Sequence, residues 1–205
     1  MKSIETIINL SEFQFKEKGS LFVGRLFPIQ SVDEAESILA EIRKKYYDAT
    51  HNCYAYKFIA DESFKYSDDG EPSGTAGIRI FNAIKHFNLS NVLIISTRYY
   101  GGTKLGVGPL GKAYYNSALG AIENGTVITK VNYSKVLIDF GYDFISDVHH
   151  FINTYKVQKI NNLFNENPQI ECMIKPEFFS KLAEDLIAVS SGKIEVKLLE
   201  DNIYL

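Results

Sequence analysis

Three carboxylates gather within four positions of the chain, at Asp68, Asp69 and Glu71. Like charges this close repel one another unless a cation, an arginine or water compensates them. Interleaved Gly and Pro residues indicate a tight turn, so we expect the three acids to converge on one point. Such a cluster suits a divalent metal, a general base or a clamp on a basic partner. The alternative is a solvated acidic loop in which Ser73 or Thr75 caps the next helix.

A glycine-rich segment combines flexible backbone with positive charge. It runs from Arg98 to Lys112 and contains Lys104. Its glycines allow the backbone to approach a ligand closely, and amides at a helix N-terminus attract anions. The segment therefore predicts a phosphate-binding loop, the alternative being a tight strand-to-helix crossover with no ligand. The candidate binding residues are Arg98, Tyr99, Tyr100, Gly101, Gly102, Lys104, Gly106 and Lys112.

His51 and Cys53 lie two positions apart on a predicted strand, so their side chains share one face. A Cys–His nucleophilic pair is conceivable, but a half-buried core pair is favoured because no orienting acid can be identified. His149 and His150 fall on a polar predicted helix and are expected at the surface. Cys53 and Cys172 are too far apart in sequence to suggest a disulfide framework or a zinc site on their own.

The elements that position these residues follow from hydrophobic periodicity. A capping box at 31–34 starts a helix that continues to Tyr46. The near-continuous apolar run 91–97 predicts a strand buried on both faces. A further helix begins near Pro109 and is expected to end in a left-handed cap at Asn124-Gly125. The remaining predictions for this half are strands at 4–15, 21–27 and 52–60, a loop at 61–72, and a helix containing Ile80, Phe81, Ile84 and Phe87.

From Val131 the pattern changes to strand, helix, strand, strand, helix, strand. The expected ranges are 131–140, 143–156, 157–164, a turn at 165–168, then 169–175, 177–189 and 193–199. This βαββαβ order is typical of the ferredoxin-like arrangement. The charge changes at the same place: residues 1–130 carry 15 Lys and Arg against 14 Asp and Glu, and residues 131–205 carry 7 against 11. We therefore predict an α+β protein of two domains, 1–128 and 131–205.

The composition of the 205 residues restricts the class of protein. With 45% hydrophobic and 23% charged residues it is typical of a globular protein, and no window suits a membrane span. Glu5 and Glu12 interrupt any signal-peptide region, so a cytoplasmic location is expected. A net charge of −3 lacks the basic character of a dedicated DNA-binding protein. Any polyanion contact must therefore use a local patch.

Five motifs, in order along the chain, resemble the IMPACT/YigZ family. They are Lys18-Gly19-Ser20-x-Phe22, Ala49 to Tyr56, Asp68 to Gly77, Thr97 to Gly106, and Ala113-Tyr114. The resemblance covers about residues 18–115, and the second half resembles the bacterial YigZ-type members by pattern. Four places depart from the usual family pattern: Ile78-Arg79 replaces Lys-Pro, Tyr100 replaces Phe, Pro109 replaces Gly and Lys112 replaces Arg.

The resemblance implies a first domain with the fold of the second domain of a small-subunit ribosomal protein, shared with part of elongation factor G. It implies a ferredoxin-like second domain similar to another domain of that factor. Eukaryotic members regulate translation during amino-acid starvation by competing for the activator of a stress kinase, partly through an additional N-terminal domain. This chain starts directly at the family domain, so we expect a bacterial-type member.

The leading hypothesis is a translation-linked regulatory protein that contacts RNA, a ribosome or a translation-related protein. It would use the glycine-rich loop, with Tyr99 and Tyr100 available to stack on bases. No cofactor and no membrane contact are expected. The alternative is a metal-assisted, hydrolase-like enzyme in which Asp68, Asp69 and Glu71 hold a metal and His51 is the acid/base. A third possibility is a regulator that binds only protein.

Overall fold

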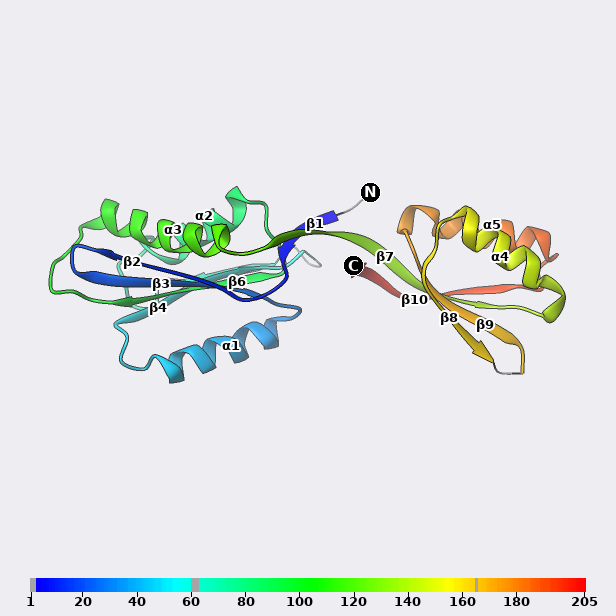
Figure 1. The fold of residues 1–205 in the computed structure, drawn as a ribbon, viewed down its shortest axis with the longest axis horizontal. Helices are drawn as coiled ribbons and strands as arrows, with labels where there is room; N and C mark the ends of the chain where they lie inside the picture. Colours follow the sequence, from blue (N-terminus) through cyan, green and yellow to red (C-terminus); the bar gives the residue numbers. More distant parts are fainter. Residues whose placement is uncertain (1–2, 60–62, 165) are drawn as a thin grey trace. The chain divides into compact units, whose positions relative to one another are not determined.

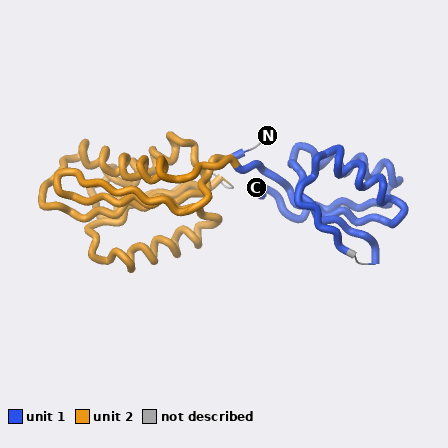
Figure 2. Tube along the Cα trace, viewed as in Figure 1, with its two compact units in different colours: residues 1–3, 130–205 blue, residues 4–129 orange. Residues whose placement is uncertain are grey.

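The computed structural model describes residues 3–59, 63–164 and 166–205 (Figure 1). The described residues form a mixed α/β structure with five α-helices and two sheets, in keeping with the expected α+β class. The chain divides into two compact units, which are coloured separately in Figure 2. One unit comprises residues 4–129, and the other comprises residues 130–205 together with Ser3.

The first unit is a five-stranded antiparallel sheet between two helical layers. The strand order is β2–β3–β6–β4–β5. Helix α1 covers one face, and helices α2 and α3 cover the other (Figure 1). The elements are β2 (Ser11–Glu17), β3 (Ser20–Pro28), α1 (Val32–Lys45), β4 (His51–Lys57), β5 (Phe64–Ser67), α2 (Gly77–His86), β6 (Val92–Tyr99) and α3 (Val107–Glu123).

Strand β6 is apolar on both sides because both of its faces are covered. Ile94 belongs to the core beneath α2 and α3, whereas Leu93 and Ile95 belong to the core beneath α1. This burial confirms the interpretation of the run 91–97. Helix α3 lies directly on β3 at Gly24, where an added Cβ would come within 2.1 Å of the Ser117 carbonyl oxygen.

The second unit has one sheet with two helices packed on it. The sheet has five strands: β1 (Ser3–Ile7), β7, β9 and β8 lie in that order, and β10 also pairs with β7. The β10–β7, β7–β9 and β9–β8 pairs are antiparallel, which gives the order β10–β7–β9–β8 across the main part of the sheet. Val136 and Ile138 of β7 pack in one core with Val148 of α4 and Leu182 of α5. The elements are β7 (Val127–Asp139), a 3₁₀ turn (Tyr142–Phe144), α4 (Ile145–Thr154), β8 (Gln158–Phe164), β9 (Pro168–Ile174), α5 (Pro176–Val189) and β10 (Glu195–Tyr204).

Several sequence expectations about elements are wrong. The segment 4–15 is two strands, because β1 (Ser3–Ile7) pairs with β7 whereas β2 pairs with β3. The expected loop 61–72 contains β5, which pairs with β4. Asn124 has a φ of −80°, and the glycine after it has no positive φ, so α3 ends without a left-handed cap. Strand β10 extends beyond the expected limit at residue 199. Residues 60–62 and 165, in the expected third strand, loop and turn, lie outside the described residues.

Candidate functional site

Asp68 satisfies the start of α2 from outside the helix, whose N-cap residue is Ala76. Its two carboxylate oxygens accept hydrogen bonds of 2.9, 2.9 and 2.8 Å from the backbone N–H groups of Gly74, Ala76 and Gly77. The expected cap by Ser73 or Thr75 is therefore wrong: the Thr75 hydroxyl donates instead to the Pro72 carbonyl at 2.6 Å. A carboxylate is the stronger partner for a helix N-terminus because its charge also complements the helix dipole.

Asp69 connects the turn to α1 and to β4. One carboxylate oxygen accepts from the Arg43 guanidinium at 2.8 Å, and the other accepts from the Asn52 backbone N–H at 2.7 Å. The Asp69 carbonyl oxygen lies 2.7 Å from His51 Nδ1. Because a carbonyl oxygen can only accept, the proton is on Nδ1 of His51.

Glu71 is buried, with its side chain 5% exposed. Its Oε1 atom accepts from the Arg98 guanidinium at 2.6 Å and from the Tyr114 hydroxyl at 2.7 Å. His51 Nε2 lies 3.8 Å from the other carboxylate oxygen. The expectation that the three acids converge on one point is wrong, since Asp68, Asp69 and Glu71 each have a separate set of partners. Within residues 3–59, 63–164 and 166–205, no three His, Cys, Asp or Glu side chains are grouped to hold a metal ion.

Cys53 lies beneath the same turn and is fully buried. Its thiol donates to the Asp68 carbonyl oxygen at 3.0 Å. Burial raises the pKa of the Cys53 thiol far above its ordinary value, and burial likewise raises the pKa of the Tyr114 hydroxyl. Both groups are therefore neutral donors at physiological pH. This disfavours the nucleophilic interpretation of the Cys–His pair, because the thiolate is the reactive form.

Arg98 is a buried cation. The strand register places it opposite His51 and Phe22, on the face of the sheet that α2 and α3 cover. Its residue exposure is 5%; one terminal nitrogen binds Glu71, and the other donates to the Ser20 hydroxyl at 3.3 Å. The Arg98 Nε atom is buried and has no hydrogen-bond partner among the described residues. The positive charge of Arg98 is thus balanced by Glu71 before any ligand binds.

The two neighbouring tyrosines are separated by the alternation of the strand. The Tyr99 hydroxyl donates to Asp48, in the segment between α1 and β4, at 3.2 Å. Tyr100 lies at the end of the strand with 46% of its surface exposed, and the Arg98 guanidinium carbon is 5.4 Å from its ring centre. The structure therefore leaves Tyr100, and not Tyr99, beside Arg98.

The glycine-rich loop, residues 101–106, contains glycines of two kinds. Gly101 packs against Gly19 so closely that an added Cβ would lie 1.9 Å from the Gly19 carbonyl carbon. Gly102 and Gly106 have φ values of +86° and +82° and face open space. Gly106 is the N-cap of α3, no side chain caps this helix, and its first turn, 107–110, contains no acidic residue. In the part of the chain that the structure describes, the first amides of α3 therefore have no capping carboxylate.

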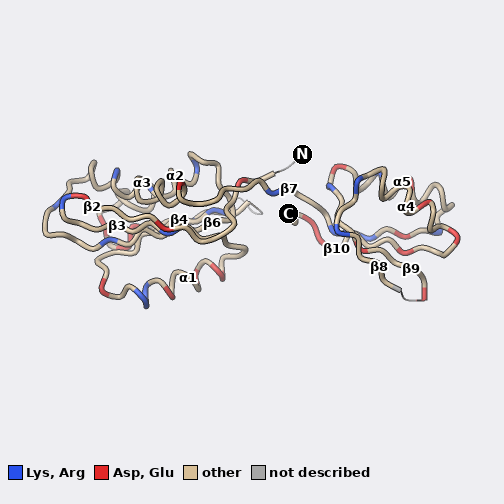
Figure 3. The backbone as a smooth tube through the Cα atoms, viewed as in Figure 1, with Lys and Arg blue, Asp and Glu red and all other residues tan. Residues whose placement is uncertain are grey.

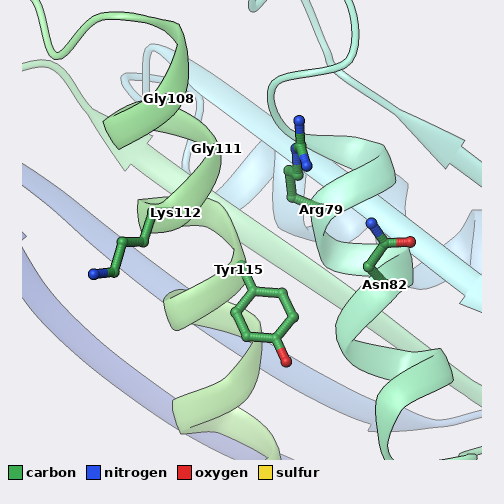
Figure 4. A pocket seen from close by; sticks show the side chains of 6 residues that line it. All are labelled: Arg79, Asn82, Gly108, Gly111, Lys112 and Tyr115. Atoms are coloured by element: carbon green, nitrogen blue, oxygen red, sulfur yellow. The ribbon is translucent and has the colours of Figure 1, made fainter.

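Two hollows flank the first turn of α3. The loop cavity, of about 420 Å³, brings together four of the predicted binding residues. The helix groove, of about 470 Å³, lies between α2 and α3 and contains the Lys112 position (Figure 4). The loop cavity is lined by Glu71, Arg98, Tyr100, Lys104, Gly106 and Leu110, among others; the helix groove is lined by Arg79, Asn82, Gly108, Gly111, Lys112 and Tyr115.

Arg79, Asn82 and Tyr115 are site residues that the sequence analysis missed. Arg79 and Asn82 project from α2, the Tyr115 ring lies between the helices, and the Lys112 ammonium group extends away from α2 (Figure 4). Gly111 makes room for Arg79, whose Nε atom would be 3.2 Å from an added Cβ. The sequence feature that could have identified Arg79 is the charge pattern of α2, which carries Arg79 and Lys85 and no acidic residue.

Comparison with known proteins gives the family. The Impact N-terminal domain matches residues 18–122, which is just over half of the chain. The chain belongs to the IMPACT family. This confirms the resemblance inferred from the five motifs.

Relatives in this family differ in how much of their length the chain covers. IMPACT family member YvyE of Bacillus subtilis is 26% identical over 198 residues, which cover 96% of this chain and 91% of YvyE. Protein IMPACT of Rattus norvegicus is 33% identical over 94 residues, which cover 44% of this chain and only 30% of the rat protein. A solved structure described as a hypothetical protein matches with a TM-score of 0.69 at 23% identity over 98% of both chains, which shows a shared fold.

Of the helices in the described part of the chain, none has the length and apolar character needed to cross a membrane.

Proposed function

We propose that this IMPACT-family protein is a cytoplasmic, translation-linked regulator that works by binding RNA or the ribosome. The contact surface would be the helical face formed by α2 and α3, together with the glycine-rich loop. A translation role is what the family resemblance implies, and eukaryotic relatives carry the name Protein IMPACT. The contacts and charges around α3 are what supports a binding role.

The proposal includes the two fold names that the resemblance implies. A ferredoxin-like second domain over 131–205 is supported by the βαββαβ element order and by the strand order β10–β7–β9–β8. A first domain over 1–128, related to the second domain of a small-subunit ribosomal protein, is supported by the sheet covered by α1 on one face and by α2 and α3 on the other.

The charge of the α2–α3 face carries the proposal. Arg79, Lys85 and Lys112 are on these helices, and the one acid in 77–86 and 107–123 is Glu123, at the end of α3. Figure 3 marks these charges along the backbone. The whole chain has a net charge of −3, so this face differs from the rest of the molecule. Clustered cations without neighbouring acids are the feature by which proteins contact phosphate backbones.

Aromatic side chains lie beside these cations. Tyr115 lines the helix groove next to Arg79, and its hydroxyl oxygen lies 3.0 Å from His86 Nδ1. Tyr100 is half exposed beside the glycine-rich loop. Aromatic rings next to positive charge suit single-stranded RNA, whose unstacked bases pack on such rings. The helical face therefore favours a single strand over a duplex.

The acidic turn supports binding over catalysis. Asp68, Asp69 and Glu71 hold α2, α1 and Arg98, and each is occupied by hydrogen bonds within the protein. A metal ion would have to displace these partners. For this reason we do not extend the proposal to a metal-assisted hydrolase.

Fluorescence anisotropy with a labelled single-stranded RNA tests the proposal. We expect binding that weakens as salt rises, and a double variant Arg79→Ala/Lys112→Ala with weaker binding. The logarithm of the binding constant falls linearly with the logarithm of the salt concentration, and the loss of two phosphate contacts should make this slope less steep by about 1.4. The matched control, Lys44→Ala/Lys193→Ala, removes two exposed lysines, one in α1 and one between α5 and β10, and is expected to leave the slope unchanged.

Three results would count against RNA binding by the α2–α3 face. Wild-type protein that fails to bind RNA at low salt would reject the RNA contact. Equal salt slopes for the two double variants would reject the α2–α3 face as the contact surface. Co-purification of a partner that survives nuclease treatment, together with no RNA binding, would favour the hypothesis of a purely protein-binding regulator.

A further inference from the structure

The loop cavity lies between the acidic turn and the glycine-rich loop, and its volume of about 420 Å³ is that of a small-molecule site. It differs from the helix groove in having a buried ion pair, Arg98 with Glu71, in its wall. Its lining also combines polar groups with apolar side chains.

One wall is the start of α3. Gly106 and Val107 line the cavity and are the N-cap and the first residue of this helix. No side chain caps α3, and its first turn contains no acid. The N-terminus of a helix with 17 residues carries partial positive charge, here at the N–H groups of Val107 and Gly108 because Pro109 has none, so it attracts an anion.

A second, independent observation on the same cavity also indicates a bound ligand. Arg98 lines the cavity, is 5% exposed, and has a buried Nε donor without a partner in the described part of the chain. Buried donors in folded proteins are almost always satisfied, so an acceptor on a bound ligand would complete this one once a shift of the guanidinium brings the enclosed Nε atom to the cavity surface. Lys104 is exposed on the cavity lining and forms no ion pair among the described residues. The charge of Arg98 is already paired with Glu71, so it is Lys104 and the start of α3 that favour an anionic group on the ligand.

The remaining walls are apolar. Leu105 and Leu110 are each 6% exposed, and they line the cavity together with the half-exposed ring of Tyr100. The Arg98 guanidinium beside that ring, at 5.4 Å, adds a second flat surface. A ligand that fills this cavity therefore has a flat or apolar body in addition to its anionic group. A phosphorylated nucleotide combines both properties.

We infer that the loop cavity binds one nucleoside monophosphate unit, with its phosphate at the start of α3 beside Lys104 and its base against Tyr100. The unit is either a free nucleotide or one unstacked nucleotide of an RNA. In the second case the inference rests on the proposed function, because the strand would continue past the first turn of α3 to Arg79. The helix groove would then hold the phosphates of the neighbouring nucleotides.

Titration of the full-length protein with adenosine monophosphate tests the cavity directly. We expect shifts in the backbone NMR signals of Val107 and Gly108, and weaker binding of adenosine and of inorganic phosphate, each of which supplies half of the contacts. In a second arm, Tyr100→Ala weakens binding of an adenine octanucleotide about tenfold, the effect expected for one lost base stack. Its salt slope stays unchanged, because no charge is removed. Tyr47→Ala, at an exposed tyrosine between α1 and β4, is the matched control.

The two arms separate this inference from the proposed function. Octanucleotide binding that Tyr100→Ala leaves intact, with no response to the monophosphate, overturns the inference while RNA binding stands. Monophosphate binding without octanucleotide binding supports the cavity as a free-nucleotide site and rejects the RNA function. Failure of both probes overturns both.

Discussion

Two helices on the same face of the first unit begin in opposite ways. At the start of α2, Asp68 accepts three backbone N–H groups, so the amides are satisfied within the protein. At the start of α3, Gly106 provides no side chain and the first turn has no acid. Both helices follow a glycine-containing turn, but among the described residues no carboxylate caps the start of α3. The acidic residues are used within the protein, whereas Gly106 leaves the start of α3 uncapped, which is what the proposed anion site needs.

The same contrast applies to the two arginines of the site. Arg98 is enclosed and neutralised by Glu71, whereas Arg79 is exposed beside α3 without an acidic partner in the described ranges. A strand position facing the core gives the first arginine a structural role as well. An outward helical position leaves the second exposed, as the proposed RNA contact requires.

The largest expected effect follows removal of the enclosed carboxylate. Glu71→Ala leaves Arg98 buried without its counter-charge, so we expect the free energy of unfolding to fall by about 3–5 kcal/mol. Urea denaturation measures this loss. Glu36→Ala, at the exposed pair with Lys65, is the control and should cost less than about 1 kcal/mol. Equal losses in the two variants would mean that the buried pair has no special role.

Removal of the carboxylate at the start of α2 comes next. Asp68→Ala leaves three N–H groups without their charged acceptor, and hydrogen bonds to charged groups contribute about 1.5–3 kcal/mol. Ser31→Ala removes the cap of α1, a single hydrogen bond to the Glu34 N–H, and should cost less. A larger loss of stability in Ser31→Ala than in Asp68→Ala would contradict the claim that the carboxylate stabilises its helix start more strongly than the hydroxyl does.

Alkaline pH tests the enclosed thiols. Burial raises the pKa of Cys172 to about 12 and raises that of Cys53 as well. An unfolded thiol ionises near its ordinary pKa of 9.0, so stability is fully present below pH 9 and falls as the pH rises toward 12. Each thiol contributes up to about 1.4 kcal/mol per pH unit. Denaturation at several pH values should show a shallower fall in Cys172→Ala; an unchanged slope contradicts the expected coupling.

The smallest expected change in stability comes from a substitution at the start of α3, and the same variant tests whether this helix start binds an anion. Val107 is 67% exposed in the first turn of α3. Val107→Asp adds a negative charge at the helix start and should raise the stability by about 0.3–1 kcal/mol. The same charge should weaken RNA binding, because it occupies the place of a phosphate. Val107→Asn is the uncharged control, and thermal denaturation with anisotropy measures both effects. Unchanged RNA binding would exclude the start of α3 as an anion site.

Local patterns in the sequence predict much of this fold. The apolar run 91–97 gives β6, and the capping box gives α1 with its N-cap at Ser31. Strand β5 escapes prediction because its short polar sequence depends on pairing with β4 and on stacking of Phe64 against Phe81. Such stabilisation comes from residues distant in sequence, which periodicity does not reveal.

The site is predicted less completely than the fold. The glycine-rich loop identifies Tyr100, Lys104 and Gly106, which the structure places around one cavity. The sequence does not show that Arg98 is enclosed, because the pairing with Glu71 requires the turn and β6 to meet in three dimensions. Nor does it identify Arg79, whose place beside Gly111 depends on how α2 packs on α3.

The contact between Gly24 and Ser117 has a consequence for recognition. Because β3 carries no side chain at this point, the backbone of α3 is seated directly on the sheet, midway along the helix. Gly120 is seated in the same manner against the Phe13 ring. A helix held at its middle and toward its end cannot readily slide, so its first turn keeps a fixed position. An incoming anion would then meet a preorganised partner and lose little conformational entropy in the protein on binding.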